Sequence, residues 1–380
     1  MMAAERLDAL VCRLPENVLF LSGHWPLIGW SFLVLPLDGN PVCIVPHCDE
    51  KEAGEELWNA ERISFSFGVL ASGNPFDDIG AALKRIAFGK KWRRIGFEGG
   101  FETVAPSWNA AEVAIPAQIT RKILEDVFGI GNLVDATELL NSQRATKTFR
   151  EAEKIRIANE ISTFGLKTFC EKVIPGISGV ELVAEVERAI MIQGTGYKNV
   201  RRVRAFAQVS TGEAETADGF RPMEISTTRK LVSGEIALLE LAVVADGFWC
   251  DRTRVRVAGK PDQRQINIFE TLKTAQAAAI GKVRPGIKAG EVDEAARSIV
   301  RKAGFEKEFF HVTGHGIGLR YHEPVPLICP GSDLVLETGM VHTVEPGIYF
   351  AGFGGMRIED DILVTDSGRE IFGPFEKELS

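Results

Sequence analysis

The stretch 236–257 reads IALLELAVVADGFWCDRTRVRV and carries most of the information about the fold. Two apolar runs flank Asp246-Gly247, a dipeptide that is favoured in two-residue hairpin turns. Because such a turn sets the residues on either side of it opposite each other, the register of the flanking strands follows. The sequence therefore predicts an antiparallel hairpin with strands over 236–245 and 248–257.

Two acids of this hairpin share one face. The predicted register places Glu240 opposite Thr253, and side-chain alternation then makes Glu240 and Asp251 diagonal neighbours. Two adjacent carboxylates in an apolar hairpin are costly unless a cation neutralises them or one of them takes a proton. The alternative is a solvated hairpin face, on which Arg252 and Arg254 would offset the acids.

Half of the six histidines lie in one short segment, at His311, His315 and His322. Glycines around His315 permit a tight backbone, and neutral imidazole is both a metal ligand and a proton shuttle near neutral pH. The segment is not a zincin helix, because a proline follows His322-Glu323, and it lacks the Lys-Ser/Thr ending of a phosphate-binding loop. Three clustered histidines indicate a site rather than separate structural roles.

Two further acids stand in strand-like runs near the end of the sequence, in MVHTVEPGIY (340–349) and GMRIEDDILV (355–364). Taken alone, Glu359 could be an exposed strand residue paired with Arg357, and His342 is expected to be a buried residue behind the site. Together the candidates are four carboxylates and one imidazole with no thiolate, a set that suits a pair of Mn²⁺, Co²⁺, Fe²⁺ or Zn²⁺ ions. They are Glu240, Asp251, His315, Glu345 and Glu359.

The 380 residues are long enough for two domains. Short apolar runs, including one at 18–21, follow a strand-and-turn rhythm in the first part. Thr148 and Glu151 then have capping-box spacing and begin a long amphipathic helix, which predicts a domain boundary near residues 140–147. Later helices are expected over 179–193, 262–282 and 291–303, and strands near 340–350 and 356–365.

Composition excludes several classes of function. Forty-four basic and 52 acidic residues give a net charge of −8 without runs of like charge, which argues against nucleic-acid binding. Six scattered cysteines without a CxxC pair indicate reduced thiols in the cytoplasm. The uncharged stretch 17–37 is interrupted by glycines and prolines, so it predicts two short strands around a loop rather than a membrane span. No membrane or nucleic-acid partner is expected.

These residues resemble the pita-bread metallopeptidase family, which includes methionine aminopeptidase, aminopeptidase P, prolidase and creatinase. The resemblance rests on the order of the acids and the histidine, and on the segments DRTR (251–254), GHGIG (314–318), EPG (345–347) and RIED (357–360). The segments LVCRLPENVLFLSG (10–23) and RATK (144–147), the latter with Glu151, are also similar to the creatinase and prolidase branch. Methionine aminopeptidase is disfavoured because it lacks the first domain.

The resemblance implies an α/β plus α+β chain. A creatinase/prolidase-like N-terminal α/β domain would occupy 1–142 and a pita-bread catalytic domain 143–380, in a cytoplasmic homodimer. The implied activity is a dinuclear metallohydrolase that cleaves an amide bond of a small peptide, with Xaa-Pro as a candidate substrate. Two alternatives stay open: a small-metabolite C–N hydrolase or lyase like creatinase, and a catalytically silent pita-bread binding module.

Carried over position by position, the resemblance makes five residues metal ligands. Asp251 and Glu359 would bridge two divalent ions. Glu240 would complete one coordination shell, and His315 with Glu345 would complete the other. The ions would be Mn²⁺, Co²⁺, Fe²⁺ or Zn²⁺.

The resemblance also implies catalytic roles. Glu345 would shuttle a proton, His322 would orient the substrate, and His311 would lie beside it. Position 240 is glutamate where the peptidases have aspartate, so its carboxylate reaches one methylene farther. Met223 stands about where proline-specific members carry a histidine that contacts substrate. We therefore expect Met223 to line the substrate pocket, to favour an apolar group and to weaken turnover of Xaa-Pro dipeptides.

Overall fold

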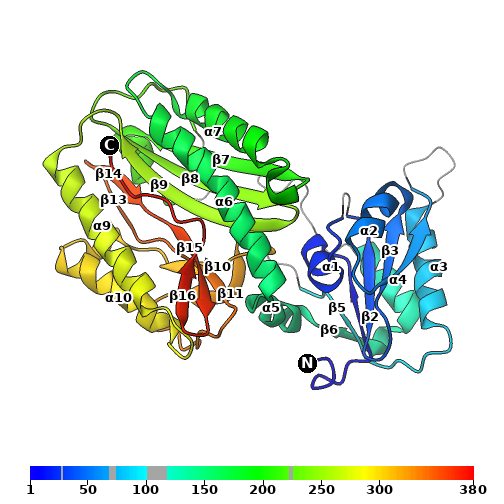
Figure 1. Cartoon of the computed structure of the whole chain (residues 1–380). Helices are drawn as coiled ribbons and strands as arrows, with labels where there is room; N and C mark the ends of the chain where they lie inside the picture. The colour runs from blue at the N-terminus through cyan, green and yellow to red at the C-terminus, as the bar shows by residue number, and fades with distance from the viewer. Residues whose placement is uncertain (27–28, 68–73, 101–117, 222–225) are drawn as a thin grey trace. The chain divides into compact units, whose positions relative to one another are not determined.

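The computed structural model describes two compact units, Met1–Arg144 and Ala145–Ser380 (Figure 1). The described residues are 1–26, 29–67, 74–100, 118–221 and 226–380. Each unit has its own buried apolar clusters. Among the helices in these ranges, none has both the length and the apolar character that a membrane span requires.

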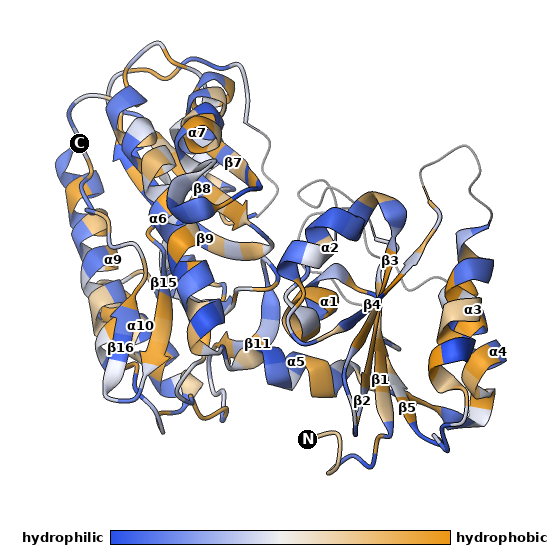
Figure 2. Ribbon diagram, turned by 45° about the vertical axis from the view of Figure 1, so that its right-hand side comes forward, coloured by the Kyte–Doolittle hydropathy of each residue, from blue (hydrophilic) through white to orange (hydrophobic). Residues whose placement is uncertain are grey.

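The first unit contains a six-stranded mixed sheet in its described part. Its strands are β1 (Ala9–Cys12), β2 (Phe32–Pro36), β3 (Val42–Pro46), β4 (Glu61–Phe65), β5 (Ile95–Phe97) and β6 (Leu133–Asp135). The strand order is β4-β3-β2-β1-β5-β6. The neighbours β1–β2 and β2–β3 are antiparallel, whereas β3–β4, β1–β5 and β5–β6 are parallel. Figure 2 shows mainly hydrophobic residues along these strands.

Helices cover this sheet. They are α1 (Pro15–Ser22), α2 (Glu50–Glu56), α3 (Pro75–Ala87), α4 (Gln118–Phe128) and α5 (Thr137–Ala145), with short 3-10 turns η1 (His47–Asp49) and η2 (Ile130–Asn132). Ile79 and Leu83 of α3 and Leu124 of α4 pack on Val11 and Ile44 of the sheet. The apolar faces of α3 and α4 therefore supply one side of the core, and their other faces are polar (Figure 2).

The strand expected at 18–21 was wrong, because these residues lie in α1. Pro15 occupies the first turn of this helix, where its fixed φ suits a helix start. Gly23 ends the helix in the left-handed conformation, with φ 79°. The helix buries Val18 and Leu19, so the short apolar run indicates buried residues but not the type of element that carries them.

The second unit forms three sheets from its described residues. Its strands are β7 (Val203–Thr211), β8 (Ile236–Ala245), β9 (Phe248–Val257), β10 (Gly314–Gly316), β11 (Glu323–Ile328), β12 (Val341–Val344), β13 (Gly347–Phe350), β14 (Gly354–Arg357), β15 (Asp360–Thr365) and β16 (Gly368–Ile371). The sheets have the orders β7-β8-β9, β11-β10-β12-β15-β16 and β13-β14.

The helices of this unit are close to the predicted positions. They are α6 (Phe149–Lys172), α7 (Gly179–Gly194), α8 (Gly212–Ala217), α9 (Gln263–Lys282) and α10 (Ala289–Lys302), with 3-10 turns η3 (Tyr197–Asn199) and η4 (Glu306–Glu308). The capping box is confirmed: the Glu151 backbone N–H donates to Thr148 Oγ1, and the Thr148 N–H donates to Glu151 Oε2 at 2.7 Å. In Figure 1, α6 and α7 lie against the β7-β8-β9 sheet.

The predicted hairpin is confirmed as β8 and β9. Asp246 and Gly247 both have positive φ values, 47° and 89°, as a type I′ turn requires. Glu240 lies opposite Thr253, as expected. The β8 residues on the other side of the strand, Leu239 and Leu241 among them, join the apolar cluster with α6 and α7. Glu240 therefore points away from these helices.

Each of the two C-terminal strands expected from the sequence divides into a pair of shorter strands. The run 340–350 is interrupted at Glu345-Pro346, between β12 and β13, and the run 356–365 is interrupted before β15 at Glu359. Pro346 has no N–H to donate to a strand ladder. The Glu345 N–H donates instead to Thr313 O at 2.8 Å, and the Glu359 N–H donates to Thr253 O at 3.1 Å. The interruptions place both acids at strand ends.

Candidate metal centre

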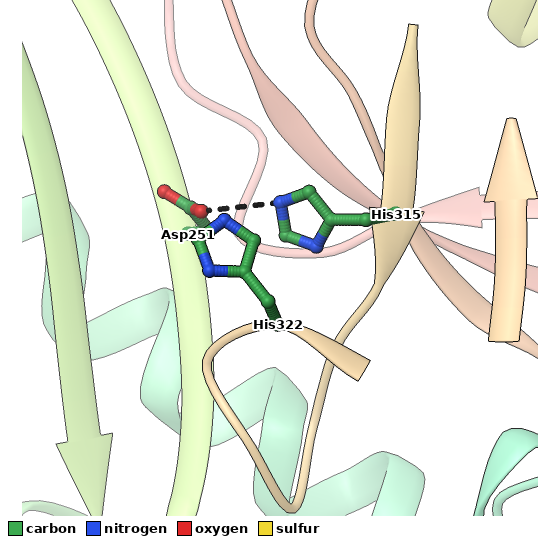
Figure 3. Close-up of side chains that lie close together, drawn as sticks. All are labelled: Asp251, His315 and His322. Carbon is green, nitrogen blue, oxygen red and sulfur yellow. Dashed lines mark ion pairs between the residues drawn. The ribbon is translucent and has the colours of Figure 1, made fainter. Parts of the chain in front are cut away.

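Three acids from other segments of the second unit surround the side chain of His315. Asp251 comes from β9, His315 from β10, and Glu345 and Glu359 from the interruptions beside β12 and β15. The His315 Nε2 atom lies 3.5 Å from Asp251 Oδ2 and 3.5 Å from Glu345 Oε1. Figure 3 shows Asp251 facing this nitrogen and His322 approaching from the loop after β10. The imidazole therefore lies at the centre of the cluster.

The donor atoms form two overlapping sets that could each hold a metal ion. One set contains Asp251, His315 and His322, and the other contains His315, Glu345 and Glu359. Within each set, one ligand atom from every residue lies within 4.8 Å of the others. His315 belongs to both sets, so the two possible positions share this residue.

The backbone around His315 fixes its ring. Its Nδ1 atom lies 2.9 Å from Gly316 O, which leaves Nε2 to face the acids, and its backbone N–H donates to Thr343 Oγ1 at 3.1 Å. This is the arrangement in which a metal-binding histidine donates its other N–H to a carbonyl. A Cβ atom at Gly314 would lie 2.0 Å from Thr343 O, and one at Gly316 would lie 2.3 Å from Val325 O. The glycines are therefore required by close backbone approach.

Two of the carboxylates are buried and incompletely satisfied. Asp251 is 2% exposed and Glu359 is 1% exposed, and among the described residues Asp251 Oδ1 and Glu359 Oε1 have no hydrogen-bond partner. Burial, with repulsion from neighbouring acids, raises the pKa of Asp251 and of Glu359 well above their usual ranges. Clustered carboxylates with free oxygens beside an imidazole fit a divalent cation, which would remove this repulsion.

Hydroxyl groups orient the remaining carboxylate oxygens. Thr253 Oγ1 donates to Glu359 Oε2 at 2.6 Å, and Thr343 Oγ1 donates to Glu345 Oε1 at 3.1 Å. Burial raises the pKa of Glu345, although its side chain keeps 12% exposure. Glu345 is therefore the acid of this cluster that solvent reaches most readily.

Glu240 is buried near these acids but lies outside both donor sets. Its Oε1 atom accepts a hydrogen bond from the Tyr321 hydroxyl at 2.6 Å, and its Oε2 atom accepts one from Arg357 Nη2 at 2.7 Å. The sequence suggested Arg357 as a partner of Glu359, but that separation is 3.8 Å. The guanidinium group is closest to Glu240.

The three clustered histidines have different surroundings. The rings of His315 and His322 lie 4.0 Å apart between centroids, and burial lowers the pKa of His322 well below its usual range. His311 is outside the donor sets and packs against Phe309 and Tyr349. Burial lowers the pKa of His311 to about 3, so this imidazole is neutral. His342 is buried, as expected, with Nδ1 2.8 Å from Thr343 O.

Met223 lies outside the described residues, so its expected contact with the substrate stays a prediction.

Sequence reasoning missed several residues that support the site. Tyr321 directly precedes His322 and contacts Glu240, although nothing in its spacing marks that contact. Lys147 Nζ lies 2.6 Å from Glu323 Oε2, and Glu323 Oε1 accepts the Leu319 N–H at 2.9 Å. This buried ion pair fixes both ends of the short loop that carries His322. Lys147 stands in the polar segment RATKTFRE (144–151), so its sequence context does not mark a buried ion pair.

Comparisons with known proteins agree with this geometry. Residues 153–366 match Metallopeptidase family M24. The chain is 31% identical over 344 residues to the Xaa-Pro dipeptidase of Lactobacillus helveticus and 30% identical over 342 residues to that of Lactobacillus delbrueckii subsp. lactis, covering 90% of this chain and 85% of each relative. The structure of the prolidase from Pyrococcus horikoshii has a TM-score of 0.81 and 26% identity, covering 100% of this chain and 97% of that one.

Proposed function

Because this chain belongs to metallopeptidase family M24, we propose that its second unit binds two divalent ions and hydrolyses small peptides, Xaa-Pro dipeptides among them. The chain is a metallohydrolase with a pita-bread fold. The observation that carries the proposal is the group of buried carboxylates around His315 Nε2. Their free oxygens and their mutual repulsion favour a bound cation over a second proton.

We assign the ligand roles from the resemblance to the family, and the geometry around His315 supports four of them. The proposed metal ligands are Asp251, His315, Glu345 and Glu359. Glu240 would lie beside the position of the second ion. His322 belongs to one of the donor sets but is assigned to the substrate. Divalent ions bound there would polarise a scissile carbonyl group and activate water. Carboxylate and imidazole donors suit Mn²⁺, Co²⁺, Fe²⁺ or Zn²⁺.

Glu345 is the proposed proton shuttle. Its Oε1 atom accepts a hydrogen bond from Thr343 Oγ1, whereas Arg357 Nε lies 4.0 Å from Oε2, beyond hydrogen-bond distance. Glu345 Oε2 is therefore free to accept a proton from water and to pass it to the departing amine nitrogen. The partial exposure of this side chain lets it exchange that proton with solvent.

His322 and His311 are proposed to act on the substrate as neutral groups. The Nδ1 atom of His322 and the Nε2 atom of His311 have no hydrogen-bond partner among the described residues. Because burial lowers the pKa of each ring, a free nitrogen can accept or donate one hydrogen bond without carrying charge. We propose that His322 orients the scissile amide and that His311 lies beside the substrate.

The test is a metal and substrate panel on the full chain. Protein purified without chelator should contain a divalent metal, and chelation should abolish hydrolysis of Xaa-Pro dipeptides until Mn²⁺, Co²⁺, Fe²⁺ or Zn²⁺ is restored. Matched Xaa-Ala dipeptides and Xaa-Pro tripeptides would define the specificity. Glu345→Gln should lower kcat at least about a thousandfold. Metal-loaded protein that cleaves none of these peptides would exclude this function and favour a non-peptide substrate.

We also propose that the enzyme is a cytoplasmic homodimer whose two units are a prolidase-like N-terminal domain and a catalytic domain. All six cysteines are unpaired, which suits a reducing compartment. Light scattering of the purified chain tests the oligomeric state. A monomeric mass at working concentrations would exclude the dimer.

A further inference from the structure

A buried side-chain amide on strand β7 makes no hydrogen bonds. Gln208 is 5% exposed, yet neither its Oε1 atom nor its Nε2 atom has a hydrogen-bond partner among the described residues. Its neighbours Ala207 and Val209 belong to the apolar cluster under α6 and α7, so Gln208 points away from these helices. A buried polar group without a partner destabilises the folded protein, unless a ligand supplies the missing hydrogen bonds.

The strand register places Gln208 beside the metal centre. Gln208 lies directly opposite Glu240 on β8, and Glu240 lies opposite Thr253 on β9. Directly opposed residues project from the same face of a sheet, with Cβ atoms about 4.5–5.5 Å apart. Asp251 precedes Thr253 by two residues, so side-chain alternation places it on this face as well. Gln208 is therefore next to Glu240 and faces the same side of the sheet as the candidate ligand Asp251.

A series of aromatic contacts connects this part of the sheet with His322. Phe206 shares the face of Gln208 and stacks on Trp249, with 5.8 Å between ring centroids and an interplanar angle of 19°. The ring centroid of Tyr321 lies 5.9 Å from that of Trp249 and 4.3 Å from that of His322. Phe206 and Trp249 are both half-buried, so the exposed parts of their rings form an apolar wall beside Gln208.

The unsatisfied atoms of Gln208 define the chemistry of the missing partner. Oε1 accepts hydrogen bonds and Nε2 donates them, so one group must supply both a donor and an acceptor. A carboxylate would leave Oε1 without a partner, and an ammonium group would leave Nε2 without one. A trans peptide bond has its N–H and C=O groups on opposite sides and can satisfy only one atom. A primary carboxamide presents both on one planar edge and satisfies both atoms.

We propose that Gln208 is a specificity-determining residue that binds the carboxamide of an asparagine or glutamine side chain in the substrate. The inference rests on the proposed hydrolase function and names the class of peptide that the site prefers. Acidic analogues are disfavoured, because they would bring another carboxylate next to Glu240. Phe206 and Trp249 would contact the apolar part of the bound side chain.

Replacing Gln208 with methionine keeps the length of the side chain and removes both hydrogen-bonding groups. Because these groups have no partner in the ligand-free protein, we expect Gln208→Met to raise its melting temperature by about 2–4 °C. The same substitution should weaken binding of a carboxamide-bearing dipeptide at least about tenfold and leave binding of its methionine analogue unchanged. A purely structural role would lower the melting temperature and would not distinguish between the two ligands.

Gln265→Met is the matched control. Gln265 is a buried glutamine of α9 whose Nε2 atom donates to Gly234 O at 2.8 Å, and whose Oε1 atom accepts from the Asp262 N–H at 2.9 Å. Because these hydrogen bonds are already made within the protein, we expect its substitution to lower the melting temperature and to leave ligand preference unchanged.

The experiment is calorimetric titration of dipeptides into the full chain with Mn²⁺, in a Glu345→Gln background whose slow turnover preserves the ligand. Gln-Pro, Met-Pro and Glu-Pro place the test side chain before the scissile bond, and Ala-Gln, Ala-Met and Ala-Glu place it after that bond. The proteins compared are Glu345→Gln alone and the same protein with Gln208→Met or Gln265→Met. Thermal unfolding of each ligand-free protein gives the melting temperatures.

Binding of Gln-Pro over Met-Pro, or of Ala-Gln over Ala-Met, by at least about tenfold supports the inference if Gln208→Met abolishes the preference and raises the melting temperature. Equal binding within each pair, binding of none of the dipeptides, a preference that survives Gln208→Met, or a melting temperature that Gln208→Met does not raise would overturn it. Hydrolysis of Xaa-Pro dipeptides by wild type would then leave the proposed function intact. Selective carboxamide binding without hydrolysis by wild type would count against the proposed function only.

Discussion

Asp251 is a buried carboxylate that the surrounding protein leaves partly unsatisfied. Replacing it with asparagine removes the charge but keeps the size, so repulsion from Glu240 and Glu345 disappears. We expect Asp251→Asn to lose tight metal binding and to stabilise the metal-free protein by about 1–3 kcal/mol near neutral pH. Thermal unfolding with and without chelator measures both effects.

The control for that substitution lies in the same hairpin. Asp246 has a positive φ, which asparagine also tolerates, so Asp246→Asn should leave metal binding unchanged. Metal-free Asp251→Asn that is less stable than metal-free wild type would show that another group compensates the Asp251 charge.

Met223 raises a separate question of specificity. Its thioether cannot supply the charge-assisted contact expected of a histidine at this position, so we expect Met223→His to increase turnover of Xaa-Pro dipeptides about ten- to a hundredfold. The measurement is kcat/KM across an Xaa-Pro panel, with Met191→His on α7 as the control. Equal values for wild type and Met223→His would show that this residue does not contact the substrate.

At the scale of the elements, strand β10 sets the position of His315. Gly316→Ala would drive a Cβ atom to within 2.3 Å of a backbone oxygen, which neither strand can avoid without moving. We expect this variant to lose about 1–3 kcal/mol of stability and to bind metal more weakly. Gly281→Ala is the matched control, because its Cβ atom would enter open space in helix α9, where alanine should add about 0.5–1 kcal/mol.

Unfolding in denaturant and Mn²⁺ titration of both glycine variants test this prediction. Normal metal affinity in Gly316→Ala would mean that β10 and β11 separate without displacing the His315 ring.

Elements with strong local signals were predicted well from the sequence. The Asp246-Gly247 turn determines the β8–β9 register, and Thr148 with Glu151 marks the start of α6. The helix α1 was mistaken for a strand because a short buried run has no distinctive period. The contact between Tyr321 and Glu240 was not predictable, because it forms only where the loop after β10 meets β8.

At the scale of the whole molecule, the α/β plus α+β organisation and the pita-bread fold expected from the sequence are confirmed. The positions of the domains remain a proposal, which limited proteolysis tests. Proteases cleave preferentially at the boundary between two domains, because few contacts hold the chain in place there. We expect a resistant C-terminal fragment of about 235 residues that starts near Ala145 and still binds Mn²⁺. A resistant fragment that begins beyond about residue 170 would contradict the proposal, because it would lack much of α6.

The stability of the first unit should depend on pH through Glu98. This partly buried carboxylate accepts hydrogen bonds from Asn17 Nδ2 at 2.7 Å and from the Arg13 N–H at 2.7 Å, and its pKa is raised from 4.5 to about 7, mainly by burial. The folded unit therefore binds this proton more tightly than the unfolded chain does. Its stabilising effect is complete below about pH 4.5 and is lost as the pH rises through about 7.

We expect the free energy of unfolding to fall by about 1–2 kcal/mol between about pH 5 and pH 8 from this group, a value reduced for partial exposure. Glu98→Gln has no proton to lose and should flatten that part of the profile, whereas Glu61→Gln, an exposed residue of β4 in the same unit, should keep the wild-type slope. The measurement is urea unfolding at about pH 5 and about pH 8, and the quantity compared is the change in the free energy of unfolding between the two. Parallel profiles for wild type and Glu98→Gln would show that Glu98 stays ionised throughout, with the N–H donors of Arg13 and Asn17 outweighing the cost of burial.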